Sequence, residues 1–393
     1  MADYLLGDIV EFIGGGTPDK SKPEYWNGPI PWASVKDIKS SHLTQTQDFI
    51  SEEGLKSSTS KLIPPGTVII ATRMAVGRAA INSKSMAINQ DLKALKPKVK
   101  LEPKFLLHLM LANALILNSK ATGATVKGIR LEHLKGLKVS IPPFEEQKRI
   151  AGILDAAEEL KQKRQKSLEL INELKQSIFI EMFGDPILNS KSWPLEKLKN
   201  LTSKIGSGAT PRGGSKSYKD EGIPLIRSMN VQDGLFTSKG IAYIDDGQAK
   251  ALNNAQVLGS DVLLNITGAS VARVCITPKE YHGARVNQHV AIIRPTSHLN
   301  CLFLQFQLIN PSFKSKLLSG AGGGATREAI TKSDIENTTV IHPPIEEQNK
   351  FAQRITKISQ FESDYSLSFK KLDELSASLE KKAFSGELSG ATA

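Results

Sequence analysis

The sequence has few cysteines and no long apolar run, and each absence excludes a class of protein. Cys275 and Cys301 are the only cysteines among 393 residues. Neither belongs to a Cys-x-x-Cys pair, which argues against a disulfide framework and against a zinc knuckle, so we expect both to be core thiols. The chain has no run of 18 apolar residues and no export signal of basic, apolar and small residues at its start, which predicts a cytoplasmic protein without membrane contact.

Sequence motifs for catalysis are also missing. No Gly-x-Gly-x-x-Gly follows a predicted strand, and the seven histidines form no His-Glu-x-x-His pair. Residues 208–215 resemble a phosphate-binding loop, but Gly214 stands where that loop needs a lysine. Ile141–Phe144 resembles the (Asn/Asp)-Pro-Pro-(Tyr/Phe) loop of amino-methyltransferases, yet Ile141 cannot accept a hydrogen bond from a target amine. We therefore expect a chain that is not itself an enzyme and holds neither a cofactor nor a metal.

The chain contains one long internal repeat. The segment Ile13–Pro18, Ile-Gly-Gly-Gly-Thr-Pro, returns as Ile205–Pro211. The strongest match joins Pro142–Gln147 to Pro343–Gln348, where Pro-Pro-x-Glu-Glu-Gln recurs after 201 residues. Self-similarity at a fixed period indicates a repeated structural unit, so the sequence predicts two copies of one architecture.

Each copy begins with a globular part. Short runs of β-forming residues follow turn formers, as in Thr67–Thr72 after Pro64-Pro65-Gly66 and in Asp261–Ile266 after Gly259. Helices are expected over Phe105–Asn118 and Leu302–Ile309, covering part of such a sheet. With 40% hydrophobic residues the chain can form real cores. The fold class is therefore α+β, with mixed α/β modules in tandem.

Each copy ends in a long helix. The Pro-Pro pair cannot continue a helix, and the two glutamates after it suit the dipole of a first helical turn. Apolar residues then recur every 3.5 residues, the period of a coiled coil, although Arg164 and Tyr365 interrupt the seam. Two separate amphipathic helices, each on its own globule, are the alternative. The predicted seam comprises Ile150, Leu154, Ala157, Leu160, Leu168, Ile171, Leu174 and Ile178 in the first helix, and Phe351, Ile355, Ile358, Phe361, Phe369, Leu372, Leu375 and Leu379 in the second.

Charge separates the helices from the globular parts. The chain carries 51 Lys and Arg against 40 Asp and Glu, a formal charge of +11. Residues 145–183 and 346–384 together contribute −1, so the remaining segments carry +12. Because phosphate neutralisation requires lysine and arginine where a duplex lies, basic globules joined by a charge-balanced helix favour a nucleic-acid partner. A helix of 39 residues would extend roughly 58 Å and act as a spacer.

The repeated modules, each followed by a helix introduced by Pro-Pro-x-Glu-Glu-Gln, resemble the specificity (S) subunit of type I restriction-modification systems over essentially the whole chain. The resemblance implies that each module is a target recognition domain for one half of a split, asymmetric DNA site. It also implies that the helices form an antiparallel coiled coil that fixes the half-site separation. The implied domains are a first recognition domain over 1–143, a spacer helix over 144–185, a second recognition domain over 186–344, and a second spacer helix with the C-terminal tail over 345–393.

The resemblance also implies the partners of the chain. Its partners would be double-stranded DNA, two modification (M) subunits that bring S-adenosylmethionine and methylate adenine, and restriction (R) subunits that join to translocate and cleave DNA. The specificity subunit itself would not be catalytic. There are two alternatives. Weak, salt-independent DNA binding would favour a non-catalytic coiled-coil adaptor. Binding of S-adenosylmethionine by the isolated chain would favour a self-contained DNA methyltransferase.

Candidate DNA contacts are polar residues at the ends of predicted segments. Arginine can bind guanine, and asparagine or glutamine can bind adenine, through paired hydrogen bonds. Asn89-Gln90 and Asn287-Gln288 are identical in both copies, which favours a structural turn. Arg73 is replaced by the stretch Asn265-Ile266-Thr267 in the second copy, and this divergence makes it a candidate for base recognition. The DNA-binding candidates are Lys20, Lys22, Lys36, Arg73, Arg78, Lys127 and Arg130 in the first module, and Lys216, Lys219, Arg227, Asn230, Asn265, Thr267, Arg273, Arg327 and Lys332 in the second.

Overall fold

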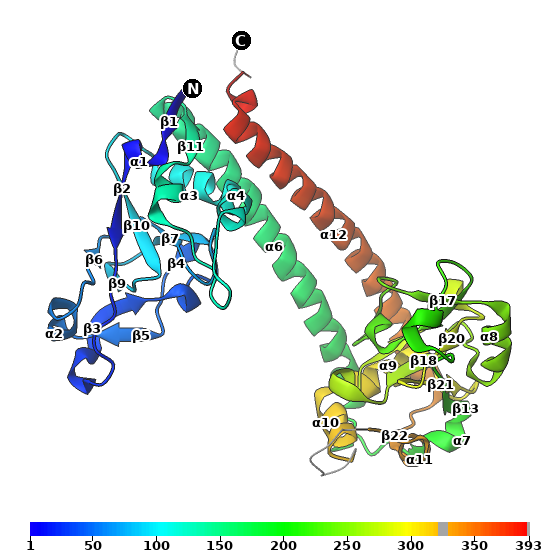
Figure 1. Ribbon diagram of the computed structural model, residues 1–393. Coiled ribbons are helices and arrows are strands. Elements are labelled where there is room, and N and C mark those ends of the chain that lie inside the picture. The colour runs from blue at the N-terminus through cyan, green and yellow to red at the C-terminus, as the bar shows by residue number, and fades with distance from the viewer. Residues whose placement is uncertain (321–328, 391–393) are drawn as a thin grey trace. The chain divides into compact units, whose positions relative to one another are not determined.

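Two long helices begin directly after the Pro-Pro pairs: α6 (Phe144–Phe183) and α12 (Ile345–Ser385) (Figure 1). The computed structural model describes residues 1–320 and 329–390. The chain divides into a first unit of residues 1–165 and 367–393 and a second unit of residues 166–366. Each unit therefore contains one globular module and a half of each long helix.

The glutamine of the repeated motif fixes the start of each long helix. The buried side chain of Gln147 donates to the Pro142 carbonyl at 3.0 Å and accepts from the Glu102 backbone N–H at 2.9 Å. Gln348 repeats this arrangement in the second unit, donating to the Pro343 carbonyl and accepting from the Asn300 N–H. Because buried backbone groups need partners, this side chain joins the helix start to the strand and helix of its own module.

The first module contains two main sheets and a short strand pair. One sheet has the order β2-β10-β7-β8-β4 and the other the order β5-β3-β9-β6, while β1 pairs antiparallel with β11. Its strands are β1 (Ala2–Leu5), β2 (Val10–Gly14), β3 (Trp26–Ala33), β4 (His42–Leu43), β5 (Asp48–Ile50), β6 (Leu62–Ile63), β7 (Val68–Ala71), β8 (Ala79–Asn82), β9 (Met86–Ile88), β10 (Leu92–Pro97) and β11 (Lys138–Ile141), and its helices are α1 (Leu6–Ile9), α2 (Glu52–Lys56), α3 (Pro103–Ala112), α4 (Ala114–Ser119) and α5 (Leu131–Lys135).

The second module repeats this plan. Its sheets have the orders β13-β21-β18-β19 and β17-β14-β20, with β12 paired to β22 and β15 to β16. Its strands are β12 (Leu195–Lys197), β13 (Thr202–Ser207), β14 (Ile223–Ile226), β15 (Val231–Gln232), β16 (Leu235–Phe236), β17 (Ala242–Ile244), β18 (Val262–Asn265), β19 (Val274–Ile276), β20 (Arg285–Val286), β21 (Val290–Pro295) and β22 (Thr339–Ile341), and its helices are α7 (Leu198–Leu201), α8 (Asp246–Ala251), α9 (Cys301–Ile309), α10 (Pro311–Gly320) and α11 (Lys332–Asn337).

The α+β class expected from the sequence is confirmed, and the helix expected over residues 302–309 is present as α9. The helix expected over residues 105–118 is divided into α3 and α4 at Asn113, whose φ of −89° and ψ of 3° leave the helical region. Cys275 is buried, and burial raises the pKa of its thiol to about 12. Cys301 is half-buried, and burial likewise raises its pKa, so both thiols are protonated at neutral pH.

In the first unit, the two long helices run antiparallel and share the core of the module. Arg149 near the start of α6 donates to the Leu388 carbonyl beyond the end of α12, while Lys161 further along α6 pairs with Asp373 earlier in α12. Ile150 and Ala383 are fully buried in the same cluster as α3. Helix α3 therefore lies between the sheet and the long helices (Figure 1).

In the second unit, aromatic rings form the core between α9 and the two long helices. Phe179 and Phe183 of α6 pack with Phe303 and Phe306 of α9 and with Phe351 of α12, at ring-centroid distances of 4.8 to 6.5 Å. Four of these rings, those other than Phe306, are fully buried. The helices again run antiparallel, because Lys175 pairs with Glu362 while Phe183 contacts Phe351.

The helix seam differs from the predicted one at four positions. Leu160, Leu174, Phe361 and Leu375 are exposed, whereas their neighbours Lys161, Lys175, Glu362 and Ser376 are half-buried or buried. The seam thus includes polar residues that form ion pairs between the helices, Lys161 with Asp373 and Lys175 with Glu362. A search for apolar spacing passes over such positions, because a lysine stem can be buried while its charge is paired.

Candidate nucleic-acid interface

The two modules present the same hairpin loop between matching strands. In the first module the loop of residues 72–78 joins β7 to β8, and in the second the loop of residues 266–273 joins β18 to β19. Each loop contains two residues with positive φ, Met74 and Gly77 in the first and Gly268 and Ala272 in the second. A left-handed backbone is unfavourable for Met74, and strain of this kind is found most often where a loop serves a function.

The loop that contains the Asn-Gln pair lies against this hairpin in both modules, because the Thr72 N–H donates to the Asp91 carbonyl and the Ile266 N–H donates to the His289 carbonyl. Thr17 donates its hydroxyl to Gln90, and Thr210 donates to Gln288. The glycines before these threonines permit the close approach, because a Cβ at Gly15 would lie 2.0 Å from the Ile88 carbonyl oxygen. The Asn-Gln pairs are therefore structural turns, as their identity in both copies suggests, and the glycine clusters pack the backbone tightly against them.

The residue after each Asn-Gln turn differs between the modules. The Asn89 side chain accepts from the Asp91 N–H at 3.1 Å, and the Asn287 side chain accepts from the His289 N–H at 3.0 Å. Asp91 forms an ion pair with Arg73 of the hairpin loop, at 3.3 Å between Oδ1 and Nη1. His289 instead hydrogen bonds to Thr267. The same framework thus holds an Arg–Asp ion pair in one module and a hydrogen-bonded Thr–His pair in the other.

A further segment completes the arrangement. Arg73 forms a β-bridge with Gly128, and Thr267 forms one with Ala329. The Met74 N–H donates to the Lys127 carbonyl at 2.9 Å, which brings two of the predicted basic residues, Arg73 and Lys127, onto adjacent segments. Three segments from distant parts of the first module therefore meet at the hairpin loop, and in the second module Ala329 makes the corresponding contact with Thr267.

In the second module these loops surround a cleft of about 640 Å³. Thr267, Arg273 and His289 line it together with Met229 and Gln232 from the β14–β16 region. The Arg273 guanidinium donates to Gln232 at 2.8 Å, which holds the arginine at the cleft wall. The cleft therefore combines donors, acceptors and an exposed apolar side chain, Met229.

Most of the predicted DNA-binding residues are exposed or half-buried, but two are not. Asn230 is fully buried and accepts from the Arg227 N–H. Asn265 is also fully buried and donates to the Ser228 carbonyl at 2.9 Å. We leave both out of the proposed contacts because their amides close internal turns. Arg327 lies outside the described residues. The candidates at the surface are Lys20, Lys22, Lys36, Arg73, Arg78, Lys127, Arg130, Lys216, Lys219, Arg227, Thr267, Arg273 and Lys332.

Several of these basic residues have partners within the protein. Lys22 donates to the Tyr25 hydroxyl at 3.3 Å, a bond that raises the pKa of the lysine. Lys219 lies 3.4 Å from Asp245, and Lys332 lies 3.4 Å from Glu336. Exposed ion pairs of this kind contribute little to stability, so such lysines remain able to exchange a carboxylate for a phosphate.

Sequence reasoning missed Asp91, His289, Gln232, Met229 and Met74. Asp91 and His289 follow the repeated Asn-Gln pair directly, so an alignment of the two copies would have shown a variable position next to an invariant one. Met74 and Gly268 also occupy equivalent loop positions, but only the backbone conformation distinguishes them. Gln232 and Met229 belong to short elements that give no sequence signal.

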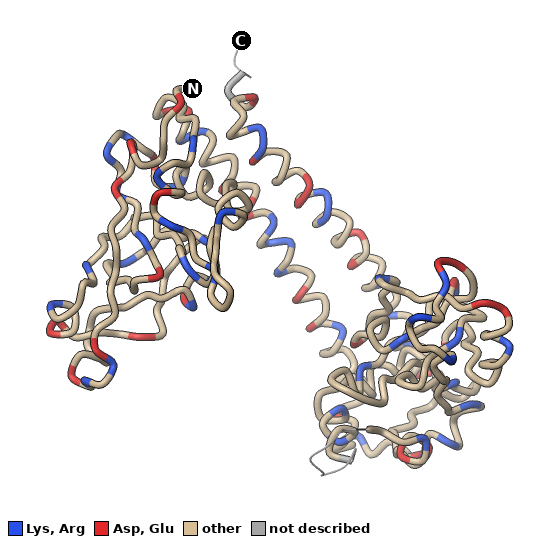
Figure 2. The backbone as a smooth tube through the Cα atoms, in the orientation of Figure 1, with Lys and Arg blue, Asp and Glu red and all other residues tan. Residues whose placement is uncertain are grey.

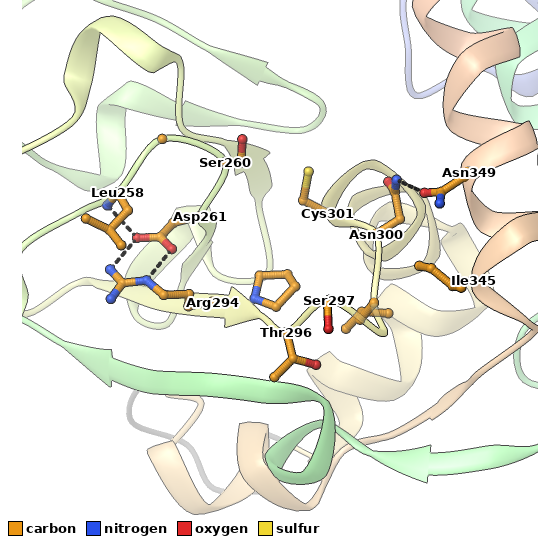
Figure 3. Close-up of a pocket in the computed structure, with 13 residues that line it drawn as sticks. Leu258, Ser260, Asp261, Arg294, Thr296, Ser297, Asn300, Cys301, Ile345 and Asn349 are labelled. Atoms are coloured by element: carbon orange, nitrogen blue, oxygen red, sulfur yellow. Dashed lines mark hydrogen bonds and ion pairs between the residues drawn. The ribbon is translucent and has the colours of Figure 1, made fainter.

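A smaller pocket of about 330 Å³ in the second unit is structural (Figure 3). Arg294 forms two hydrogen bonds of 2.8 Å with Asp261, whose carboxylate also accepts from the Leu258 N–H at 2.7 Å. The hydrogen bonds that Arg294 donates to Asp261 raise the pKa of the arginine. Both polar groups are satisfied within the protein, and neither is available as an acid or base.

The described residues contain no group of three or more His, Cys, Asp or Glu side chains arranged to hold a metal ion. Among the helices of residues 1–320 and 329–390, none is both long and apolar enough to cross a membrane. Lysine, arginine, aspartate and glutamate alternate along α6 and α12 (Figure 2), as the charge count indicates.

Comparison with known proteins identifies the repeated architecture. The family model of the type I restriction modification DNA specificity domain matches residues 1–170 and again residues 191–375. The MjaIX specificity subunit of a type I restriction enzyme from Methanocaldococcus jannaschii is 26% identical over 86% of this chain and 82% of its own length. The EcoR124I/EcoR124II specificity subunit from Escherichia coli is 34% identical over 44% of each chain.

Two solved structures share the fold. The S subunit of a type I restriction-modification system from M. genitalium has a TM-score of 0.56 at 14% identity, covering 98% of this chain and 96% of its own. A second structure, from work on the complex assembly and conformational transition of the type I restriction-modification system, has a TM-score of 0.62 at 18% identity. The match covers 98% of this chain and 97% of that one.

Proposed function

The chain belongs to the type I restriction-modification DNA specificity family, as a non-catalytic specificity subunit with two DNA specificity domains, and we propose that its modules recognise the two halves of one split DNA target. The observation that carries this proposal is the matched loop framework with different side chains. Thr17–Gln90 and Thr210–Gln288 are equivalent, whereas Arg73–Asp91 and Thr267–His289 differ. A shared framework with variable contacts suits two modules that recognise unrelated sequences.

We further propose that α6 and α12 set the separation of the half-sites. Each unit holds its halves of both helices in its own core, through Ile150 and Ala383 in the first and Phe179 and Phe351 in the second. A change in the length of the helices between these core residues would therefore alter the module position rather than the module fold. Basic loops would neutralise phosphates, and the balanced charge of the helices would leave the intervening duplex without strong contacts.

The assembly that we propose contains two modification subunits, which would bring S-adenosylmethionine and methylate adenine, and restriction subunits that join for cleavage. It would act in the cytoplasm on double-stranded DNA. Specificity subunits of this family act with other subunits and DNA. The proposed number of two modification subunits is supported by the two-fold repetition of the chain.

Competition binding tests this proposal. The complex of this chain with its modification subunits is bound to a labelled duplex containing the methylated sequence, and unlabelled duplexes carrying either half-site alone or both halves at altered spacing are added. We expect either half alone to compete at least 100-fold less well than the complete site. Equal competition by one half alone would contradict two-part recognition, and binding independent of salt would favour an adaptor.

A further inference from the structure

The hairpin loop of the first module carries an arginine, Arg73, that is ion-paired but largely exposed. The Arg73 side chain is 54% exposed, and the Asp91 side chain that pairs with it is 12% exposed. Asp91 is fixed in turn, because Asn89 both accepts from its N–H and donates to its carboxylate at 3.3 Å. Within the described residues the guanidinium makes this one ionic contact, and a guanidinium has five N–H donors, more than one such contact uses.

The equivalent positions of the second module have different chemistry in the same geometry. Thr267 occupies the place of Arg73, with the same bridge to the following segment, and His289 occupies the place of Asp91. The pair is uncharged when His289 is neutral, and it lies in a cleft beside Arg273. The framework is therefore constant and the pair at its surface varies between the modules.

We propose that Arg73 recognises a guanine in the half-site of the first module, and that Asp91 is a positioning residue that orients it. Guanine presents two acceptors, N7 and O6, in the major groove, and an arginine fork donates to both. The Asp91 carboxylate lies 3.3 Å from Nη1 and attracts the guanidinium, which favours arginine rotamers near it before DNA binds, so less conformational entropy is lost on contact. Thr267 and His289 make the corresponding contact to a different base in the other half-site.

This inference rests on the proposed function, and its test separates the two. The full chain and its variants are expressed with the modification subunits, and host DNA is sequenced for methylated adenines. The base frequencies at every position of the methylated sequence are then compared. The variants are Arg73→Gln, Asp91→Asn and Asp91→Glu, with Lys20→Gln as an exposed basic control in the same module and Thr267→Val as the counterpart in the second.

For Arg73→Gln we expect preference at one guanine to fall by about 5- to 150-fold, with every other position unchanged. Asp91→Asn should weaken preference at that same guanine, and Asp91→Glu should restore part of it, which a merely structural role would not produce. Lys20→Gln should reduce methylation evenly over all sites. Thr267→Val should relax a position in the opposite half-site only.

The inference is overturned if the wild-type target is split but Arg73→Gln lowers methylation without changing any base preference. It is also overturned if Arg73 and Asp91 variants affect different positions. A wild-type complex that methylates no split target would instead contradict the proposed function itself. Thermal unfolding of each variant shows that the modules remain folded, which the exposure of Arg73 leads us to expect.

Discussion

Lys175 of α6 and Glu362 of α12 form an ion pair in the helix seam, with the lysine side chain only 9% exposed. The neighbouring Leu174 faces solvent instead. A buried polar pair of this kind contributes little net stability but disfavours other alignments of two helices, because any shift leaves a charge without a partner. The pair thus specifies how α6 and α12 align within the second unit.

Replacing one member of this pair should destabilise the protein more than replacing both. Lys175→Met leaves the Glu362 carboxylate unpaired and should lower the free energy of unfolding by about 1–3 kcal/mol. Adding Glu362→Leu should recover most of that loss. Chemical denaturation of the four members of the double-mutant cycle measures the effect, and additive losses would show that the two residues do not interact.

The aromatic cluster should dominate the stability of the second unit. Phe183→Ala removes a fully buried ring that contacts Phe303 and Phe351, and it should cost about 3–5 kcal/mol. Phe361→Ala, at an exposed position of α12, should change stability by less than about 0.5 kcal/mol. Denaturant unfolding of both variants provides the comparison, and similar losses would contradict the assignment of the core.

Much of this architecture could be predicted from the sequence, and the reason lies in the repeated motif. Proline has no backbone N–H and cannot continue a strand or a helix interior. The Pro-Pro pairs therefore made the helix starts at Phe144 and Ile345 foreseeable. The role of Gln147 was not, because its partner, the Glu102 N–H, lies 45 residues away. The repeat favoured a structural turn at Asn89-Gln90, but the ion pair of Arg73 with Asp91 could be found only from the fold.

The seam was harder to predict because periodicity does not determine which face is buried. Leu160 and Leu174 satisfy an apolar spacing of 3.5 residues, yet each lies next to a lysine that is paired across the helices. Lysine stems are apolar, so these positions can be buried without an apolar residue. The burial of Asn230 and Asn265 could not be predicted either, since an asparagine in a turn can face inward or outward.

Glu380 provides a pH-dependent prediction. Burial raises the pKa of this carboxyl, an effect that His108 and Lys161 only partly offset. At neutral pH the ionised group therefore opposes folding, and Glu380→Gln should raise the melting temperature slightly. The wild-type protein gains stability as pH falls through the raised pKa, so the difference should disappear in acid. Thermal unfolding from pH 7 to pH 4, with the exposed Glu374→Gln as control, measures it; a constant difference would contradict the shift.

Met74 should be strained in the free protein. Its φ of 65° is unfavourable for a residue with a side chain, and its side chain is exposed, so no core contact compensates. Met74→Gly should stabilise the chain by about 1 kcal/mol, whereas Met74→Ala keeps the strain and should not. Equal melting temperatures for both variants would show that the loop relaxes without cost.

The helix seam should control the half-site separation. Leu168→Asp and Phe369→Asp place a charge at half-buried seam positions, whereas Leu170→Asp places one at an exposed position of the same helix. The seam variants should relax the preferred spacing between half-sites or unfold the helices, and Leu170→Asp should preserve it. Competition with duplexes of altered spacing measures this preference, and an unchanged preference in a folded seam variant would contradict the role of the helices.

Sequencing of methylated host DNA tests the central claim most directly. The chain is expressed with the modification subunits of its system, in a host without other adenine methylation, and every methylated adenine is located. The account predicts one target with two short defined halves around a gap of fixed length and unspecified sequence. A continuous target, or no new methylation although a soluble complex forms, would contradict recognition of a split site by the two modules.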